Sequence, residues 1–344
     1  MILVTGGSGY IGGVLVRRFL DKGYRVRVLD AGYFGHEALG DIKDKIELVE
    51  DDIRSCGPEV MKGIEHVVHL AGFSNDPTAE YRPKENFAVN VDGTRNIVGL
   101  AKDAGVKKFI FASSCSVYYT TNPDDVFEKS EDHFITPSVP YSLSKHMAED
   151  VVLGAKSSTF TPVVFRKGTV YGLSPRMRYD LVVNTMLKDA FKHKRIVLHQ
   201  GGRMWRPLTD VETVAAGYIW ALENNIDGIY NLVDMNILVR DLADEIQRTL
   251  YTRCGEMIEI ERQDVGVSRS YRVSGERLRK RGFFGSHPLQ EAIVEMWNDL
   301  KNSGRDLDHS KYYNIRVFEE LFADNKNNNH GNHTARNTWA DRWA

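Results

Sequence analysis

Residues 1–12 read MILVTGGSGYIG, and this stretch decides the fold. An apolar run at residues 2–4 leads directly into three glycines spaced three apart, Gly6, Gly9 and Gly12. An amphipathic stretch over residues 11–22 follows the glycines and predicts a helix. Strand, glycine turn and helix in this order form the phosphate-binding fingerprint of a dinucleotide-binding βαβ unit.

Each glycine of the turn has a separate physical task. Gly6 permits the tight turn, Gly9 lets a pyrophosphate approach the backbone, and Gly12 lets the helix pack against the strand. The residues that open the helix, Tyr10 and Ile11, then present backbone N–H groups and a partial positive charge to the phosphates.

Acidic residues at the ends of the next two apolar runs extend the predicted cofactor site. Asp30 lies 18 residues beyond Gly12, near the position of the acid that binds a ribose 2′-hydroxyl. A carboxylate there repels a 2′-phosphate, so NAD is favoured over NADP. Asp52 and Ile53 follow the third run and are expected at the adenine. The fourth run ends in small residues, Leu70-Ala71-Gly72, which would let a cofactor pass over the strand ends.

Composition excludes several other classes of protein. The chain has 344 residues with 45 Lys and Arg against 47 Asp and Glu, so its net charge of −2 gives no reason to expect nucleic acid or a membrane as partner. Its three cysteines are too few and too scattered for a disulfide framework or a metal cluster, which favours a reducing cytoplasm and predicts no metal. The first residues do not resemble a signal peptide, and no apolar run is long enough to cross a bilayer.

Apolar runs alternate with amphipathic stretches over the first two thirds of the chain. The runs at residues 2–4, 26–29, 46–49, 66–70, 108–112 and 163–166 predict strands, and residues 11–22, 87–104 and 141–153 predict helices. This alternation indicates an α/β fold, a Rossmann-type doubly wound parallel sheet.

The alternation of apolar runs and amphipathic stretches becomes less regular after about residue 173, which suggests a smaller C-terminal lobe of mixed α/β structure. Helices are expected at residues 181–193, 211–224, 239–251 and 288–303, with a short strand at 196–198. We expect an NAD-binding domain over residues 1–172, to which elements of residues 205–235 return. Residues 173–323 would then form mainly a substrate-binding lobe, and residues 324–344 a polar tail.

Tyr141 and Lys145 form a Tyr-x-x-x-Lys pair after Pro140. Positions i and i+4 share a face of a helix, so the phenol and the ammonium can act together. A fixed positive charge favours the phenolate and lowers the tyrosine pKa, which suits proton abstraction from a sugar hydroxyl while hydride leaves its carbon. Ser114 ends a strand-like run and is the candidate for a third hydroxyl at the same substrate oxygen.

These motifs together resemble the extended short-chain dehydrogenase/reductases, and more narrowly the NAD-dependent nucleotide-sugar epimerases and dehydratases. The resemblance covers roughly residues 1–300 and rests on TGGSGYIG, HLAG, NVDGT, SSCSVY, YSLSK, RKGTVYG and RPLTDVETVA, in the family's order.

The resemblance implies a role for each matching residue. Tyr141 would be the acid/base, Lys145 would bind the nicotinamide ribose, and Ser114 would be the family's Ser or Thr. Ala71 and Asn90 would line the cofactor path, with Ser113 and Lys167 on the cofactor side. Substrate contacts are expected from Ser74, Ser114, Cys115, Ser116, Thr169, Asn184, Arg206 and Arg269, with the two arginines on a diphosphate.

Several positions depart from the family pattern. Cys115-Ser116 stands where 4,6-dehydratases carry an Asp-Glu pair, which argues against a dehydratase, and Cys115 is expected to pack beneath the site as a small apolar residue. Tyr119 replaces a glycine near the substrate mouth. Lys167 replaces an aromatic residue or Asn beside the nicotinamide pocket, where it alters how the ring is held or adds a charge for an anionic sugar.

The resemblance leaves three functions open. An NAD-dependent epimerase of a nucleotide-diphosphate sugar, working through a transient keto sugar, is favoured. A nucleotide-sugar 4-keto reductase or dehydrogenase is the alternative, and a non-catalytic NAD-binding regulator is disfavoured because Tyr141 and Lys145 are both present. The resemblance also implies a homodimer formed by a bundle of the helices at residues 87–104 and 141–153.

Overall fold

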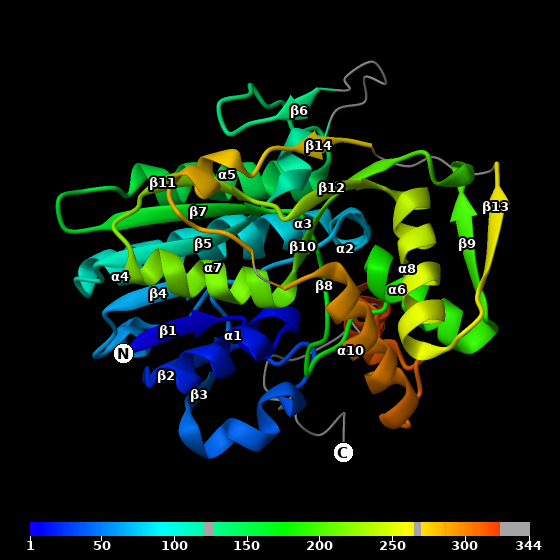
Figure 1. Cartoon of the computed structure of the whole chain (residues 1–344). Coiled ribbons are helices and arrows are strands. Elements are labelled where there is room, and N and C mark those ends of the chain that lie inside the picture. The colour runs from blue at the N-terminus through cyan, green and yellow to red at the C-terminus, as the bar shows by residue number, and fades with distance from the viewer. Residues whose placement is uncertain (120–126, 265–269, 286, 324–344) are drawn as a thin grey trace.

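The computed structural model describes residues 1–119, 127–264, 270–285 and 287–323. Its centre is a sheet of seven parallel strands in the order β11-β7-β5-β4-β1-β2-β3 (Figure 1). The strands are β1 (Ile2–Thr5), β2 (Val26–Asp30), β3 (Glu47–Glu50), β4 (His66–His69), β5 (Lys108–Ser114), β7 (Thr161–Lys167) and β11 (Gly228–Leu232).

The order of the strands predicts where a ligand binds. The chain places β2 and β3 on one side of β1, then returns to place β4, β5, β7 and β11 on the other side. Loops after β1 and β4 therefore diverge, and they leave a crevice at the carboxyl ends of these neighbouring strands. The glycine turn follows β1 and Leu70-Ala71-Gly72 follows β4, so both lie at this crevice.

Side chains of the strands alternate between two hydrophobic cores. Ile2 and Val4 face one core, while Leu3 faces the other. The first core is covered by α1 (Tyr10–Asp21) and α7 (Val211–Glu223), which pack against each other. The second is covered by α4 (Thr94–Asp103) and α5 (Pro140–Gly154). Both faces of the sheet are buried, as a parallel sheet requires.

The other elements form the side of the molecule drawn on the right in Figure 1 and the strands above the sheet. The longer helices there are α6 (Val182–His193), α8 (Val239–Cys254) and α10 (Leu289–Asn302). Strand β9 (Arg195–His199) pairs with β13 (Glu259–Gln263), β10 (Trp205–Asp210) lies between β8 (Thr169–Tyr171) and β12 (Met235–Leu238), and β6 (Glu128–Lys129) pairs with β14 (Arg272–Val273). Three short helices remain among the described residues. Two of them, α2 (Asp76–Tyr81) and α3 (Pro83–Phe87), follow β4, and α9 (Glu276–Lys280) follows β14.

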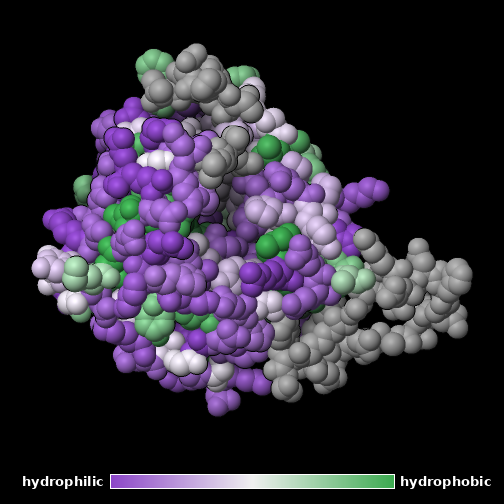
Figure 2. Space-filling view, turned by 90° about the vertical axis from the view of Figure 1, so that its right-hand side faces the viewer, coloured by the Kyte–Doolittle hydropathy of each residue, from purple (hydrophilic) through white to green (hydrophobic). Residues whose placement is uncertain are grey.

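Figure 2 shows the outer face of this side of the molecule. Hydrophilic residues cover most of it, and the hydrophobic residues form small separate groups. Within the described residues, no helix is both long enough and apolar enough to span a membrane.

The structure confirms the α/β class and the parallel sheet, and it corrects the expected elements at two places. The helix expected over residues 87–104 is divided: residues 88–93 form a π-helical turn, and only then does α4 begin. A last helix, α11 (Asn314–Ala323), was not predicted. It packs against α2, at the end of the sheet where the glycine turn lies.

Candidate active site

A cavity of about 320 Å³ lies at the carboxyl ends of the central strands. This volume is within the range of small-molecule sites. Its wall runs from the glycine turn and Asp30 at one end to Ser114 and Tyr141 at the other. One cavity therefore joins the predicted cofactor site to the predicted chemical site.

The glycine turn is packed too closely to accept side chains. Gly6 has a φ of +72°, and a Cβ on Gly12 would lie 2.3 Å from the Gly6 carbonyl oxygen. Helix α1 begins at Tyr10, directly after Gly9. Tyr10 and Ile11 line the cavity, and the first N–H groups of a helix have no partner within the helix, which suits a phosphate-binding helix start.

Asp30 is held by the glycine turn itself. Its carboxylate accepts hydrogen bonds from the backbone N–H groups of Ser8 and Gly32, both at 2.9 Å. Burial raises the pKa of this carboxyl group, and the two N–H donors counter the rise. A carboxylate fixed beside the turn suits ribose hydroxyls and repels a 2′-phosphate.

Asp52 and Ile53 line the same end of the cavity. The Arg54 side chain holds the Asp52 carboxylate, with its Nε 3.0 Å from both oxygens. Burial raises the pKa of Asp52, but the bonds from Arg54 outweigh it and leave the pKa below its usual value. Asp52 is thus an ionised residue whose position is fixed.

Tyr141 and Ser114 meet at the other end of the cavity. Pro140 opens α5, so Tyr141 lies in its first turn, and its phenol is hydrogen-bonded to the Ser114 side chain. Ser114 Oγ also accepts a bond from the Ser116 backbone N–H at 3.1 Å, which fixes the serine at the end of β5. Burial raises the pKa of Tyr141 to about 12, and the bond to Ser114 partly counters that rise.

Lys145 lies one turn after Tyr141 and lines the cavity, but it is bound to the sheet. Its Nζ donates to the Ala112 carbonyl at 3.1 Å and lies 5.0 Å from the centre of the Phe111 ring. Burial lowers its pKa to about 8. The Arg178 guanidinium counters part of the rise in the Tyr141 pKa. The effect of Lys145 on the tyrosine pKa stays a prediction.

Lys167 places a second ammonium group beside Lys145. It ends β7 with 9% of its surface exposed, and its Nζ donates to the Ser113 carbonyl at 2.6 Å. Burial, and next the charge of Lys145, lower its pKa to about 7. The cavity therefore holds two lysines whose protonation changes near neutral pH.

A buried network supports this end of the cavity from below. Glu149 of α5 accepts hydrogen bonds from Ser113 Oγ and from Arg166 of β7, at 2.9 Å from Nε and 2.6 Å from Nη2. Arg166 also donates to the Tyr118 hydroxyl at 2.8 Å. The Ser113 hydroxyl is thus turned toward α5, while its carbonyl holds Lys167.

Most of the predicted site residues line the cavity together. They are Gly6, Gly9, Tyr10, Ile11, Gly12, Asp30, Asp52, Ile53, Leu70, Ala71, Gly72, Ser74, Ser113, Ser114, Ser116, Tyr141, Lys145, Lys167 and Thr169.

Four of the predicted residues do not reach the cavity wall. The Asn90 side chain is hydrogen-bonded to the backbone of Phe73 and so fixes the loop after β4. The Cys115 thiol points at the Arg166 carbonyl, and burial raises the pKa of this thiol. Asn184 bonds the Gly172 N–H and the Tyr10 hydroxyl behind the wall. Arg206 donates to the Trp205 carbonyl. Arg269 lies outside the described residues.

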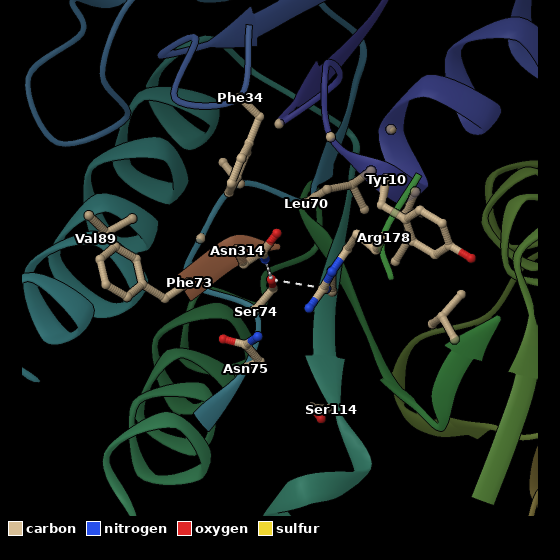
Figure 3. Close-up of a pocket in the computed structure, with 18 of the residues that line it drawn as sticks. Tyr10, Phe34, Leu70, Phe73, Ser74, Asn75, Val89, Ser114, Arg178 and Asn314 are labelled. Atoms are coloured by element: carbon tan, nitrogen blue, oxygen red, sulfur yellow. Dashed lines mark hydrogen bonds between the residues drawn. The ribbon is translucent and has the colours of Figure 1, made fainter. Parts of the chain in front are cut away.

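Several other residues line the cavity that the sequence motifs did not single out one by one. They include Tyr33, Phe34, Phe73, Asn75, Asp76, Val89, Arg176, Arg178, Tyr271, Asn314 and Phe318. The stretch SPRMRYD, residues 174–180, carries two of them, Arg176 and Arg178. Figure 3 shows Arg178 reaching Ser74, at 3.3 Å from Oγ.

Similarity to known proteins agrees with this arrangement. A family model described as the NAD dependent epimerase/dehydratase family matches residues 2–233. One relative is a protein of Methanocaldococcus jannaschii that is named for an expected UDP-glucose 4-epimerase activity. It is 28% identical to this chain, over 89% of this chain and 100% of its own length.

Solved structures share the fold. A Thermotoga maritima UDP-glucose 4-epimerase with UDP-glucose has a TM-score of 0.78 at 22% identity, covering 88% of this chain and 99% of that one. A Bacillus cereus UDP-glucuronic acid 4-epimerase, in complex with UDP-glucuronic acid and NAD, has a TM-score of 0.75 at 20% identity, over 88% and 99% of the two chains.

The glycine turn and Asp30 fit NAD, and the family model spans most of the sheet that carries them. The chain belongs to the NAD-dependent epimerase/dehydratase family of nucleotide-sugar enzymes and uses NAD as its cofactor.

Proposed function

We propose that this protein is an NAD-dependent nucleotide-sugar epimerase that acts through a transient keto sugar. The observation that carries the proposal is the hydrogen-bonded pair of Tyr141 and Ser114, which lies in the same cavity as the glycine turn and Asp30. NAD, when bound, accepts a hydride from a sugar carbon and returns it later in the cycle.

Tyr141 is the proposed acid and base. Its phenolate takes the proton of the sugar hydroxyl as the carbon loses hydride, and the phenol returns that proton when the keto group is reduced from the opposite face. Ser114 donates a hydrogen bond to the same sugar oxygen and so holds it beside the phenol. Lys145 is the proposed ligand of the nicotinamide ribose.

A dehydratase is disfavoured by the residues that follow Ser114. Water elimination in the family uses an Asp-Glu pair at this position, and here the pair is Cys115-Ser116. Cys115 is only 1% exposed and its thiol faces the Arg166 carbonyl, so it does not replace an acid.

Contacts with the nucleotide sugar are proposed for Thr169, Ser74 and Ser116, which line the cavity. Arg206 and Arg269 remain the proposed diphosphate ligands from the substrate lobe of residues 173–323. Arg206 would have to turn toward the cavity, because its Nη1 is 3.0 Å from the Trp205 carbonyl.

We also propose that the protein is a cytoplasmic homodimer formed through α4 and α5. The two helices pack on each other, and Gly99 and Met147 are exposed on them. All three cysteines are free, as a reducing compartment would leave them. Light scattering of the purified protein should give twice the chain mass, and a mass of one chain would contradict the dimer.

The substitution Tyr141→Phe tests the catalytic assignment. It should reduce turnover of the sugar by roughly 10²–10⁴-fold, because the proton has no acceptor at this position, while bound NAD is retained. Turnover is measured by the appearance of the epimer, and NAD content after denaturing the protein.

Tyr251→Phe is the matched control, since Tyr251 is 63% exposed on α8 and does not line the cavity. It should leave turnover unchanged. Full turnover in Tyr141→Phe would overturn the assignment, and stoichiometric consumption of added NADH would favour the reductase alternative.

A further inference from the structure

The C-terminal helix α11 lies at the cofactor end of the cavity, although it follows the substrate lobe in the sequence. Two contacts hold it there: Arg82, just after α2, donates to the Phe322 carbonyl at 3.3 Å, and its guanidinium lies 4.5 Å from the centre of the Phe322 ring. Residues 314–323 therefore pack beside a loop that follows β4 of the dinucleotide-binding sheet.

The Phe318 side chain of α11 packs among three aromatic rings at the cofactor end of the cavity. Its ring centre is 4.5 Å from that of Phe73, 5.8 Å from that of Phe34 and 5.9 Å from that of Tyr33. Tyr33 and Phe34 lie three and four residues after Asp30, and Phe318 lines the cavity with them. The adenosine of a dinucleotide lies beside the acid at the end of the second strand, so Phe318 borders that place.

Asn314, one turn earlier on α11, also lines the cavity. Its Nδ2 donates to Ser74 Oγ at 2.8 Å, and its Oδ1 is buried with no hydrogen-bond partner among the described residues. Asn314 is 2% exposed and lines the cavity, and Figure 3 shows it between Phe34 and Ser74. A buried amide with one unpaired polar atom is costly, so a small shift that brings this oxygen to a ligand hydroxyl would be favourable.

Arg176 adds a cation next to these residues. Its guanidinium lies 4.0 Å from the centre of the Phe34 ring, and its Nη2 donates to the Lys311 carbonyl at 3.2 Å, just before α11. Its Nε is buried and has no hydrogen-bond partner in the described part of the chain. An arginine N–H donor of this kind suits a phosphate oxygen.

We infer that α11 is part of the NAD site and binds the adenosine-diphosphate half of the cofactor. Phe318 packs against the adenine, the Asn314 amide hydrogen-bonds a ribose hydroxyl, and Arg176 donates to the pyrophosphate. The helix then forms one wall of the adenosine end of the site. This inference depends on NAD binding and not on which sugar reacts.

The rate of NAD dissociation tests the inference. The full chain is loaded with NAD and diluted into an NAD-consuming coupled assay, with no sugar present. Phe318→Ala should release NAD at least roughly tenfold faster than the unsubstituted chain, because the adenine loses an aromatic wall. Phe318→Leu, which keeps an apolar side chain, should release it at an intermediate rate and serves if the alanine variant does not fold.

Glu320→Ala is the control, since Glu320 is an exposed residue of the same helix and lies outside the cavity wall. Its dissociation rate should stay within about twofold of the unsubstituted rate. Competition with ADP-ribose should weaken in Phe318→Ala, while competition with nicotinamide mononucleotide should not change.

Two results would overturn the inference. One is an unchanged dissociation rate in folded Phe318 variants, and the other is an equal acceleration in Glu320→Ala, which would show general loosening of the helix. Either result leaves the proposed epimerase untouched, because the assay contains no sugar and Tyr141 is unaltered.

Discussion

At the scale of single residues, the two lysines of the cavity show that the site contains buried charges that reduce the stability of the fold. Lys145 and Lys167 each donate to a carbonyl of β5, Ala112 and Ser113 respectively, and burial lowers the pKa of both. A pKa depressed for a cation means that the folded protein disfavours the charged form. Such groups cost stability and are kept where function needs them.

Lys167→Met should stabilise the protein at neutral pH. The folded pKa of about 7 lies below the ordinary lysine value of 10.5, so the unfolded chain binds the proton more tightly. The cost is full below about pH 7, shrinks as the pH rises, and vanishes above the unfolded pKa. The gain in free energy of unfolding should be roughly 1–3 kcal/mol at pH 7 and near zero at pH 11.

Urea unfolding at both pH values measures this effect. Lys102→Met, at an exposed position in the last turn of α4, is the control and should change stability by less than about 0.5 kcal/mol. A loss of stability in Lys167→Met at pH 7 would contradict the argument. The same variant should lose turnover if Lys167 helps to hold the nicotinamide or an anionic sugar.

At the scale of elements, α5 is attached to the sheet by a buried ion pair. Glu149 and Arg166 are 1% and 3% exposed, and they join the helix that carries Tyr141 to β7. Burial raises the pKa of Glu149, but its bonds to His146, Arg166 and Ser113 outweigh this and leave its pKa below the usual range. The pair therefore fixes the distance between α5 and Ser114 at the end of β5.

Glu149→Gln should destabilise the protein by about 3–5 kcal/mol, because Arg166 is then buried without a counter-charge. The control is Glu223→Gln, which breaks the exposed pair with Lys22 and should cost less than about 1 kcal/mol. Chemical denaturation measures the free energy of unfolding of both variants and of the unsubstituted protein. Equal small losses would show that Arg166 finds another partner.

The sequence predicted the elements whose signals are local. The glycine turn, six of the seven strands of the sheet and α5 with Tyr141 and Lys145 follow from short motifs and hydrophobic periodicity, whereas no apolar run was predicted at β11. Helix α11 also has apolar residues at helical spacing, Val317, Phe318 and Leu321, and this signal was overlooked. Its position could not be predicted, because the contact between Ser74 and Asn314 joins residues 240 positions apart.

Side-chain directions were equally beyond the sequence. Lys145 lies on the predicted face of α5, yet its ammonium bonds the Ala112 carbonyl. Asn184 lies in a segment that borders the cavity, yet its side-chain amide is hydrogen-bonded to the Gly172 N–H and the Tyr10 hydroxyl. These choices depend on which buried polar groups need partners in the folded protein.

At the scale of the whole molecule, the order of the strands brings distant segments into one cavity. The turn after β1, the loop after β4, the start of α5 and the helix α11 all meet at the carboxyl edge of the sheet. The account predicts that one bound NAD serves repeated cycles, since the sugar carbon that loses hydride is the carbon that regains it.

The central claim is that hydride leaves and returns to the same sugar carbon. UDP-, GDP-, CDP- and dTDP-sugars are screened first, and the sugar that turns over is prepared with deuterium at the reacting carbon. Nuclear magnetic resonance of the product should show the inverted centre with its deuterium retained and no net consumption of NAD or NADH. Loss of the deuterium from that carbon, stoichiometric consumption of added NADH, or no conversion of any of these sugars would contradict the account.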